Sequence, residues 1–268
     1  MLDHLDGATR LYLILGDPIA QVKSPAGLTR LMAARGHNGA VVPGHVTAED
    51  FDAVVAAAKR LRNLDGIVVT VPHKFAAARH CDRLSDRARL LGAVNVLRRE
   101  ADGQWAGEML DGAGFVAALR QAGGEPAGRR ALLVGAGGAG SAIGAELLAS
   151  GVVALAIHDA DPARRDALIA RLQAAWPAVP VMAGGDDPAG FTLLVNATPA
   201  GMRAEDPPPL RLDRIASDAA VGDVVTAPEV TPLIAAARAR GCVASTGVAM
   251  FEAQAALLAD YLMGAARL

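Results

Sequence analysis

Short apolar runs alternate along this chain with segments in which apolar residues recur every three or four positions. Such runs are typical of buried strands, and the segments between them are typical of helices with one buried face. In the first part of the chain we expect strands at Arg10–Gly16, Ala40–Val46 and Asp65–Pro72, followed by a hairpin of Ala93–Arg99 with Gln104–Gly107. We expect helices there from Ser24 to about Arg35 and over Ala48–Arg62.

In the second part of the chain, strands and helices follow one another in regular alternation. The expected strands are Ala131–Val134, Val152–Ile157, Val179–Met182, Thr192–Asn196, Ala219–Val225 and Val243–Ser245. Helices are expected from Leu110 through Leu119, over Ser141–Leu148, from Pro162, from Pro232 and over about Val248–Met263. This alternation predicts an α/β fold with a doubly wound parallel sheet of Rossmann type, preceded by a second α/β domain.

Local signals sharpen some of these elements. Ser24 before Pro25 predicts a helix start with serine as N-cap, and Thr47 is expected to cap the helix that follows it. The apolar run Asp65–Pro72 is rich in β-branched residues, which suits a central parallel strand covered on both faces. Asp102-Gly103 predicts the turn of the hairpin.

A glycine-rich stretch links the strand Ala131–Val134 to the helix after it, and it reads Gly135, Ala136, Gly137, Gly138, Ala139, Gly140. This is a G-x-G-x-x-G pattern between a strand and a helix, where it holds a dinucleotide pyrophosphate against the helix N-terminus. The next strand ends at Asp159, at about the 20-residue spacing expected for an acidic ribose contact. A glycine-rich turn that binds nothing is the alternative, and the three parts in order favour a dinucleotide site.

The composition of the chain limits the kinds of partner and the cellular compartment that we expect. Formal net charge is −2 over 268 residues, which gives no electrostatic reason to expect nucleic acid or an anionic membrane as partner. No apolar run reaches the length of a membrane span, and the N-terminus does not resemble a secretory signal. Cys81 and Cys242 lie far apart in the chain and form no C-x-x-C motif. We therefore expect them to be free thiols of a cytoplasmic protein. The six histidines show no metal-ligand spacing, so we expect no metal site.

Polar residues near strand ends supply candidate chemistry. Lys74 follows a predicted strand and Asp111 opens a predicted helix, and together they offer one acid–base group and one carboxylate to orient it. Taken singly, each has a plainer interpretation: Lys74 as a solvated lysine and Asp111 as a helix cap. Oxidation of an alcohol by a nicotinamide needs such a pair, because the cofactor takes the hydride and the protein must accept the hydroxyl proton.

Several segments in the same order resemble the shikimate/quinate dehydrogenase family. They are Gly16–Pro25, Val68–Lys74, Gly92–Asn95, Asp111, Asn196–Met202, Thr231–Ile234 and Gly247–Ala255. The resemblance implies that Lys74 and Asp111 are catalytic and that Ser24, Thr70, Asn95 and Gln254 bind the substrate. It also implies that the cofactor contacts the glycine turn, Asp159, Asn196, Ala197, Thr198, Met202, Val224 and Gly247. Residues 1–105 with 245–268 would form the substrate domain, residues 106–244 the Rossmann domain, and the site would lie between them.

The chain departs from the family pattern at several positions. Polar residues of the family are matched here by Gln21, Val22, Val68, Met109, Leu110 and Thr226. Losing one hydrogen bond to a charged carboxylate costs on the order of 1.5–3 kcal/mol, so these changes suggest retained chemistry on an altered substrate. Many family members that use NADP have a segment resembling N-R-T-x-x-R after the second strand of the Rossmann domain. At the corresponding positions this chain has Asp159, Asp161 and Arg164. We therefore expect NAD in preference to NADP, because carboxylates repel a 2′-phosphate.

The expected function is the NAD(P)-dependent oxidation or reduction of a ring hydroxyl of shikimate or a related cyclic hydroxy acid. Quinate, an amino-substituted shikimate or a less polar alcohol are alternative substrates, and a non-catalytic dinucleotide sensor is an alternative class. A sensor without catalytic activity needs neither an acid–base group nor a carboxylate to orient it, so the presence of both Lys74 and Asp111 argues against this class. A folate-dependent dehydrogenase lacks motif support. The expected partner is a small hydroxy acid, and the chain is expected to be a monomer or homodimer.

Overall fold

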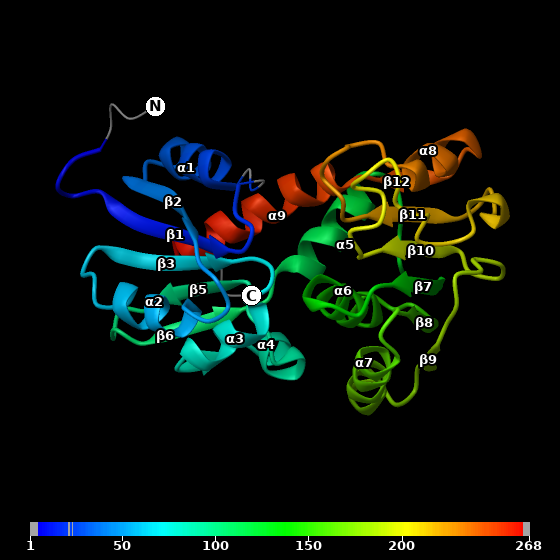
Figure 1. Ribbon diagram of the computed structural model, residues 1–268, viewed down its shortest axis with the longest axis horizontal. Coiled ribbons are helices and arrows are strands. Elements are labelled where there is room, and N and C mark those ends of the chain that lie inside the picture. Colours follow the sequence, from blue (N-terminus) through cyan, green and yellow to red (C-terminus); the bar gives the residue numbers. More distant parts are fainter. Residues whose placement is uncertain (1–4, 21, 23, 265–268) are drawn as a thin grey trace. The chain divides into compact units, whose positions relative to one another are not determined.

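The computed structural model describes residues 5–20, 22 and 24–264, and the chain divides into two compact units. One unit consists of the chain up to Leu110 together with the segment from Ala255 onward, and the other is Asp111–Gln254. The first unit therefore reaches beyond residue 105, because the strand Trp105–Glu108 pairs within its sheet. Figure 1 shows the elements of each unit along the chain.

The first unit contains a mixed six-stranded sheet of order β2-β1-β3-β5-β6-β4. Its strands are β1 Arg10–Gly16, β2 Gly39–His45, β3 Leu64–Val69, β4 Arg83–Leu84, β5 Val96–Arg99 and β6 Trp105–Glu108. Its helices are α1 Ser24–Ala34, α2 Phe51–Ala58, α3 Lys74–Ala77 and α4 Asp86–Leu91, with a 3-10 turn at Ala78–His80. The C-terminal half of α9, Gly247–Leu262, also belongs to this unit.

One face of this first sheet is covered by α1 and by the end of α9 (Figure 1). Tyr12 and Ile14 of β1 lie in one buried cluster with Leu28 of α1 and Leu258 of α9. Alternate residues of a strand point to opposite faces, which is why every second side chain of β1 joins this cluster. The N-terminal and C-terminal parts of the chain thus share a single hydrophobic core.

The second unit contains a parallel six-stranded sheet of order β12-β11-β10-β7-β8-β9. Its strands are β7 Arg130–Val134, β8 Ala154–His158, β9 Val181–Ala183, β10 Leu193–Asn196, β11 Ala220–Asp223 and β12 Val243–Ser245. Its helices are α5 Asp111–Gln121, α6 Gly138–Ala149, α7 Pro162–Ala175 and α8 Pro232–Ala239, with a 3-10 turn at Leu212–Arg214 and the N-terminal half of α9. Read from β9, this order is the 3-2-1-4-5-6 order of a Rossmann fold.

Helices cover both faces of this second sheet. Leu132 and Val134 of β7 lie in a buried cluster with Leu233 of α8, whereas Leu133 packs on the other face against Gly144 of α6. A doubly wound sheet buries its strands on both faces, and this explains the continuous apolar runs in the sequence. The predicted fold class is confirmed.

Several predicted elements are wrong in detail. The helix expected at 48–62 is only Phe51–Ala58, and its N-cap is Asp50 rather than Thr47. Thr47 instead closes a turn, with its hydroxyl 3.2 Å from the Asp50 carboxylate. The central strand β3 is parallel to β1 but antiparallel to β5, and it ends at Val69 rather than at Pro72. Among the described residues, no helix is long and apolar enough to cross a membrane.

Candidate active site

The glycine turn between β7 and α6 has the geometry of an anion-binding loop. Gly135 has a φ of +106°, which a residue with a side chain rarely adopts. A side chain at Gly140 would collide with the Gly135 carbonyl, so glycine lets α6 approach the turn closely. The N-cap of α6 is Gly137, and glycine has no side chain that could accept a hydrogen bond from the first N–H groups of the helix. These residues fit a dinucleotide pyrophosphate.

Asp159 follows β8 and is tied to the glycine turn. Its Oδ2 accepts a 2.6 Å hydrogen bond from the Ala136 N–H, and its Oδ1 accepts one of 2.8 Å from the Asp161 N–H. An ionised carboxylate has about four acceptor positions, so two remain for the hydroxyls of a ribose. Arg164 lies 4.0 Å from the Asp159 carboxylate and 3.5 Å from that of Asp161. The sequence did not predict the contact between Asp159 and Ala136, because it joins residues from different turns.

The loop after β10 lies beside the glycine turn. The Ala197 N–H donates to the Val134 carbonyl at 2.7 Å, and the Thr198 side chain lies against Gly135. This is the switch point of the sheet, between β7 and β10, where open α/β sheets bind their ligands. Asn196 is fully buried beneath this loop, whereas Met202 is 48% exposed at its far end. Val224 and Gly247 lie at the ends of β11 and β12, and Gly247 packs on the Val224 and Val225 carbonyls.

Asp111 is the first residue of α5 and is buried, with 3% of its surface exposed. Its Oδ1 accepts a 2.5 Å hydrogen bond from Nε2 of Gln254 on α9. Gly114, one turn further along α5, packs directly against Gln254 and lets the two helices approach each other. The structure therefore brings together two predicted site residues that are 143 positions apart. Asp111 lies at the N-terminal, positive end of α5.

The first unit places Thr70, Lys74 and Asn95 around the end of β3. Thr70 follows β3, and its N–H donates to the Leu15 carbonyl. Lys74 opens α3, and its carbonyl accepts a 2.8 Å bond from the Val94 N–H, next to Asn95. Asn95 is 2% exposed, and its Oδ1 accepts a 2.9 Å bond from the Leu110 N–H. Backbone hydrogen bonds therefore hold the segments carrying Lys74 and Asn95 together.

Ser24 is the first residue of α1 and is half-buried. The resemblance expects polar residues at Val22, Val68 and Leu110. Val68 and Leu110 belong to the hydrophobic cluster of the first unit, and Val22 is partly buried and packs against it. Met109 is fully buried beside them in the chain. Thr226 is half-buried in the second unit. Gln21 lies outside the described residues.

Two buried carboxylates, one in each unit, were not predicted from the sequence. Glu108 is 5% exposed and accepts hydrogen bonds from the Ser85 hydroxyl at 2.7 Å and the Met109 N–H at 2.8 Å. Asp223 is 1% exposed, and burial raises the pKa of its carboxyl above the usual value. Its position at the end of a parallel strand, like that of Asp159, was the signal that could have found it.

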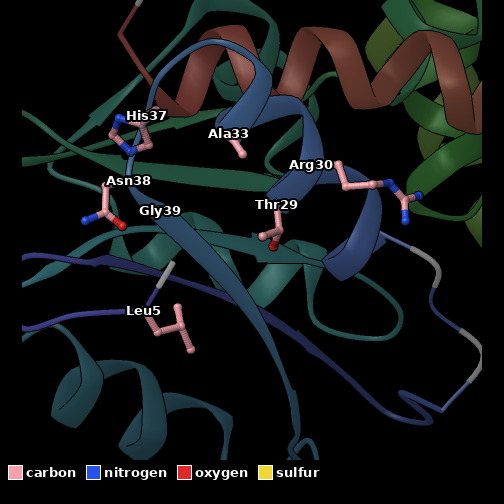
Figure 2. Close-up of a pocket in the computed structure, with 7 residues that line it drawn as sticks. All are labelled: Leu5, Thr29, Arg30, Ala33, His37, Asn38 and Gly39. Atoms are coloured by element: carbon pink, nitrogen blue, oxygen red, sulfur yellow. The ribbon is translucent and has the colours of Figure 1, made fainter. Parts of the chain in front are cut away.

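A pocket of about 210 Å³ opens at the other end of the first sheet, near the start of β2 (Figure 2). It is lined by Leu5, Thr29, Arg30, Ala33, His37, Asn38 and Gly39. Its volume is below the roughly 300–1,000 Å³ of small-molecule sites. His37 Nε2 is 2.8 Å from the Tyr12 hydroxyl, and Asn38 bonds to Asp6 and Thr9. The polar groups of this pocket therefore hold the fold together, and no predicted site residue lines it.

The Rossmann strand order, the glycine turn and the buried carboxylate at the start of α5 define a two-domain α/β dehydrogenase. Residues 14–97 match the family model described as the shikimate dehydrogenase substrate binding domain. The chain is 39% identical over 251 residues to a shikimate dehydrogenase (NADP(+)) of Rubrobacter xylanophilus, covering 92% of this chain and 88% of that one. This chain belongs to the shikimate dehydrogenase family.

Solved structures agree with this assignment. Quinate dehydrogenase from Corynebacterium glutamicum, in complex with NAD, has a TM-score of 0.87 and 29% identity, covering 96% of this chain and 94% of that one. Shikimate 5-dehydrogenase from Listeria monocytogenes, in complex with shikimate and NAD, has a TM-score of 0.89 and 26% identity, with coverage of 98% and 95%. The resemblance seen in the sequence is thus confirmed, and the chain is an oxidoreductase of this type.

Proposed function

We propose that this protein oxidises and reduces a ring hydroxyl of shikimate or a related cyclic hydroxy acid with NAD(P). The observation that carries the proposal is the buried Asp111 carboxylate, held by Gln254 in the same unit as the glycine turn. A bound nicotinamide supplies the hydride acceptor. Lys74 accepts the proton of the reacting hydroxyl, while Asp111 accepts a hydrogen bond from that hydroxyl and orients the lysine.

The remaining predicted residues position the substrate. Ser24, Thr70 and Asn95 offer hydroxyl and amide groups from the first unit, and Gln254 offers the amide hydrogen that its bond to Asp111 leaves over. The apolar cluster of Val22, Val68 and Leu110 favours a second candidate, a less polar alcohol, because apolar side chains cannot replace lost hydrogen bonds to a carboxylate. The two candidates differ in substrate and share their chemistry.

The test is a matrix of activity over shikimate, quinate, amino-substituted shikimate and a carboxylate-free cyclic polyol, each with NAD+ and NADP+. Lys74→Ala should lower kcat by about 100- to 10,000-fold, the usual contribution of general acid–base catalysis. Lys74→Arg keeps the positive charge but cannot give up a proton at neutral pH, so it should be nearly as inactive. Arg60→Ala, at an exposed position of the same unit, is the control.

Protein that binds NADH but turns over none of these alcohols, with Lys74→Ala indistinguishable from wild type, would instead support the dinucleotide sensor. High activity on the carboxylate-free polyol alone would favour the less polar substrate. Activity of Lys74→Arg close to that of wild type would show that position 74 supplies charge rather than a proton acceptor.

We also propose that NAD is preferred to NADP, although the Rubrobacter relative is named for NADP(+). The support is the pair of carboxylates at Asp159 and Asp161, which would repel a 2′-phosphate, while Arg164 is already within 4.0 Å of one and 3.5 Å of the other. Asp161→Ser removes one charge and keeps an N-cap for α7. The ratio of kcat/KM for NADP+ over NAD+ should rise by about 3- to 10-fold, a change of about 1 kcal/mol. Higher kcat/KM of wild type with NADP+ would overturn this preference.

A cytoplasmic location and a monomeric or homodimeric state complete the proposal. The support for the location is that Cys81 and Cys242 are both free thiols. Light scattering coupled to gel filtration would measure the oligomeric state.

A further inference from the structure

Asp223, at the end of β11, is a buried carboxylate that the proposed chemistry does not use. Its Oδ1 accepts hydrogen bonds of 3.0 Å from Asn196 Nδ2 and of 3.0 Å from the Val225 N–H. Its Oδ2 accepts a 2.7 Å bond from the Thr231 hydroxyl. Burying a carboxylate is costly unless donors replace water, and these donors come from three separate segments. Asp223 therefore links the end of β10, the loop after β11 and the start of α8.

Asn196 connects Asp223 to the loop that follows β10, because its side-chain amide bonds to both. An ionised carboxylate only accepts hydrogen bonds, so Asn196 must turn its NH₂ group toward Asp223 and its oxygen away. That oxygen accepts bonds from the Thr198 N–H at 3.0 Å and from the Thr198 hydroxyl at 2.6 Å. The same NH₂ group donates to the Ala200 carbonyl at 3.1 Å. The orientation of one amide thereby fixes the shape of residues 196–200.

Thr231 holds the other end of the same loop. It is 1% exposed, its hydroxyl caps α8 by accepting from the Ile234 N–H, and its side chain lies against Gly201. At its beginning, the loop packs Ala197 and Thr198 against Gly135 of the glycine turn. Both ends of the 196–202 loop thus depend on partners of Asp223.

We propose that Asp223 is a positioning residue that holds the 196–202 loop in the shape that receives the nicotinamide half of the cofactor. It acts through Asn196 and Thr231 and does not touch the cofactor itself. The inference rests on the proposed function: a dinucleotide spans the two halves of a Rossmann sheet, so with one ribose at Asp159 after β8 its nicotinamide half lies over β10 and the 196–202 loop. The glycine turn, which receives the pyrophosphate, keeps its own supports from Asp159 and α6.

The test compares two ligands that differ only beyond the pyrophosphate and its terminal ribose. NADH carries the nicotinamide ring and ADP-ribose lacks it. In Asp223→Asn, one of the two acceptor oxygens becomes an NH₂ group, so either the bonds from Asn196 and Val225 or the bond from Thr231 loses its acceptor. The Kd for NADH should therefore rise by about tenfold, equivalent to about 1.4 kcal/mol. The Kd for ADP-ribose should change by less than about twofold, because its contacts lie on the glycine turn. Asp213→Asn, an exposed site in the same unit, makes the same chemical change and should alter neither Kd.

A second pair of variants keeps the test decisive if Asp223→Asn does not fold. Thr231→Val removes the hydroxyl bonded to Asp223 and keeps the shape of the side chain, whereas Thr231→Ser keeps the hydroxyl. The Kd for NADH should rise severalfold in Thr231→Val and stay near wild type in Thr231→Ser.

Folded variants that bind both ligands like wild type would show that Asp223 only stabilises the fold and would overturn the inference. Equal weakening of NADH and ADP-ribose would overturn it as well, because the effect would then reach the whole nucleotide site. Wild-type protein that binds neither ligand would overturn the proposed function, and the inference with it. A failure of the role given to Asp223 is therefore distinguishable from a failure of the proposed function, because only the latter affects nucleotide binding by the wild-type protein.

Discussion

His73 and Lys74 are neighbours in the chain, and His73 is buried whereas Lys74 is half-buried. His73 is 2% exposed, its ring stacks on Phe51 with centroids 4.3 Å apart, and its Nε2 lies 2.7 Å from the Val46 carbonyl. A nitrogen facing a carbonyl carries a hydrogen, so this histidine donates and cannot serve as a base through Nε2. Its role is to fix the start of α3 and thereby to position the backbone of Lys74.

His73→Ala should lower the free energy of unfolding by about 2–4 kcal/mol, because it leaves a cavity beside Phe51 and removes a buried hydrogen bond. Urea unfolding followed by circular dichroism would measure the change. His45→Ala, at a side chain that is 58% exposed, should stay within about 0.5 kcal/mol of wild type. Equal effects of the two substitutions would contradict the anchoring role.

Tyr12 gives the protein a stability dependence at high pH. It is 1% exposed, and burial raises the pKa of its hydroxyl from 10 to about 12. Between these values the unfolded chain ionises while the folded chain does not, so this contribution to stability is lost as pH rises from 10 to about 12. The decline of Tm over this range should be steeper in wild type than in Tyr12→Phe. Parallel declines would show that Tyr12 is not responsible.

Among the elements, α4 shows how a short helix escapes prediction from the sequence. It spans six residues, Asp86–Leu91, and has little room for a periodic pattern. Its capping signals were present: the Ser85 side chain accepts from the Ala88 N–H, and Gly92 ends the helix with a φ of +62°. Ser85 also donates to the buried Glu108, so the cap connects α4 to β6.

Ser85→Ala should destabilise the first unit by about 1–3 kcal/mol, since it removes the helix cap and one partner of a buried carboxylate. Ser85→Thr keeps the hydroxyl and should recover most of the loss. Chemical denaturation of the three proteins would measure this difference. An alanine variant as stable as wild type would show that water replaces both interactions.

The direction of a strand relative to its neighbours depends on how the elements are connected and paired, and the sequence of the strand alone does not specify it. The apolar run of β3 indicated burial on both faces, which is correct, but burial does not specify the direction of a neighbour. β5 pairs with β3 in antiparallel register, and on its other side it forms a hairpin with β6, whose turn at Asp102-Gly103 was predicted and is confirmed. In the parallel sheet, by contrast, crossover connections that contain α6, α7 and α8 return the chain to the same edge, so the next strand runs in the same direction.

For the whole molecule, the notable feature is that the first unit is discontinuous in sequence. Leu258 of α9 is 4% exposed and packs in one cluster with Tyr12 and Val68, about 190–250 positions earlier in the chain. The C-terminal helix therefore completes a core that the N-terminal strands begin. Only Ala255 and the residues after it contribute this surface, while the preceding half of α9 belongs to the other unit.

Leu258→Ala should lower the free energy of unfolding by about 2–5 kcal/mol, the range for deleting a buried leucine side chain. Hydrogen exchange should quicken in β1 and β3 of the first unit rather than only in α9. Leu61→Ala, at a residue 47% exposed, is the matched control and should have little effect. Faster exchange confined to α9 would mean that the helix is dispensable for the first sheet.

The sequence by itself determined the Rossmann unit, its glycine turn and the residue types of the candidate site. These depend on local rules, because strand and helix periodicities and the backbone freedom of glycine act over a few neighbouring residues. Only the tertiary structure decided that Gln254 holds Asp111, that Asp159 supports Ala136 and that Asp223 organises the loop after β10. The physical reason is that a buried polar group must find its partner wherever the fold brings one, and no spacing along the chain records that choice.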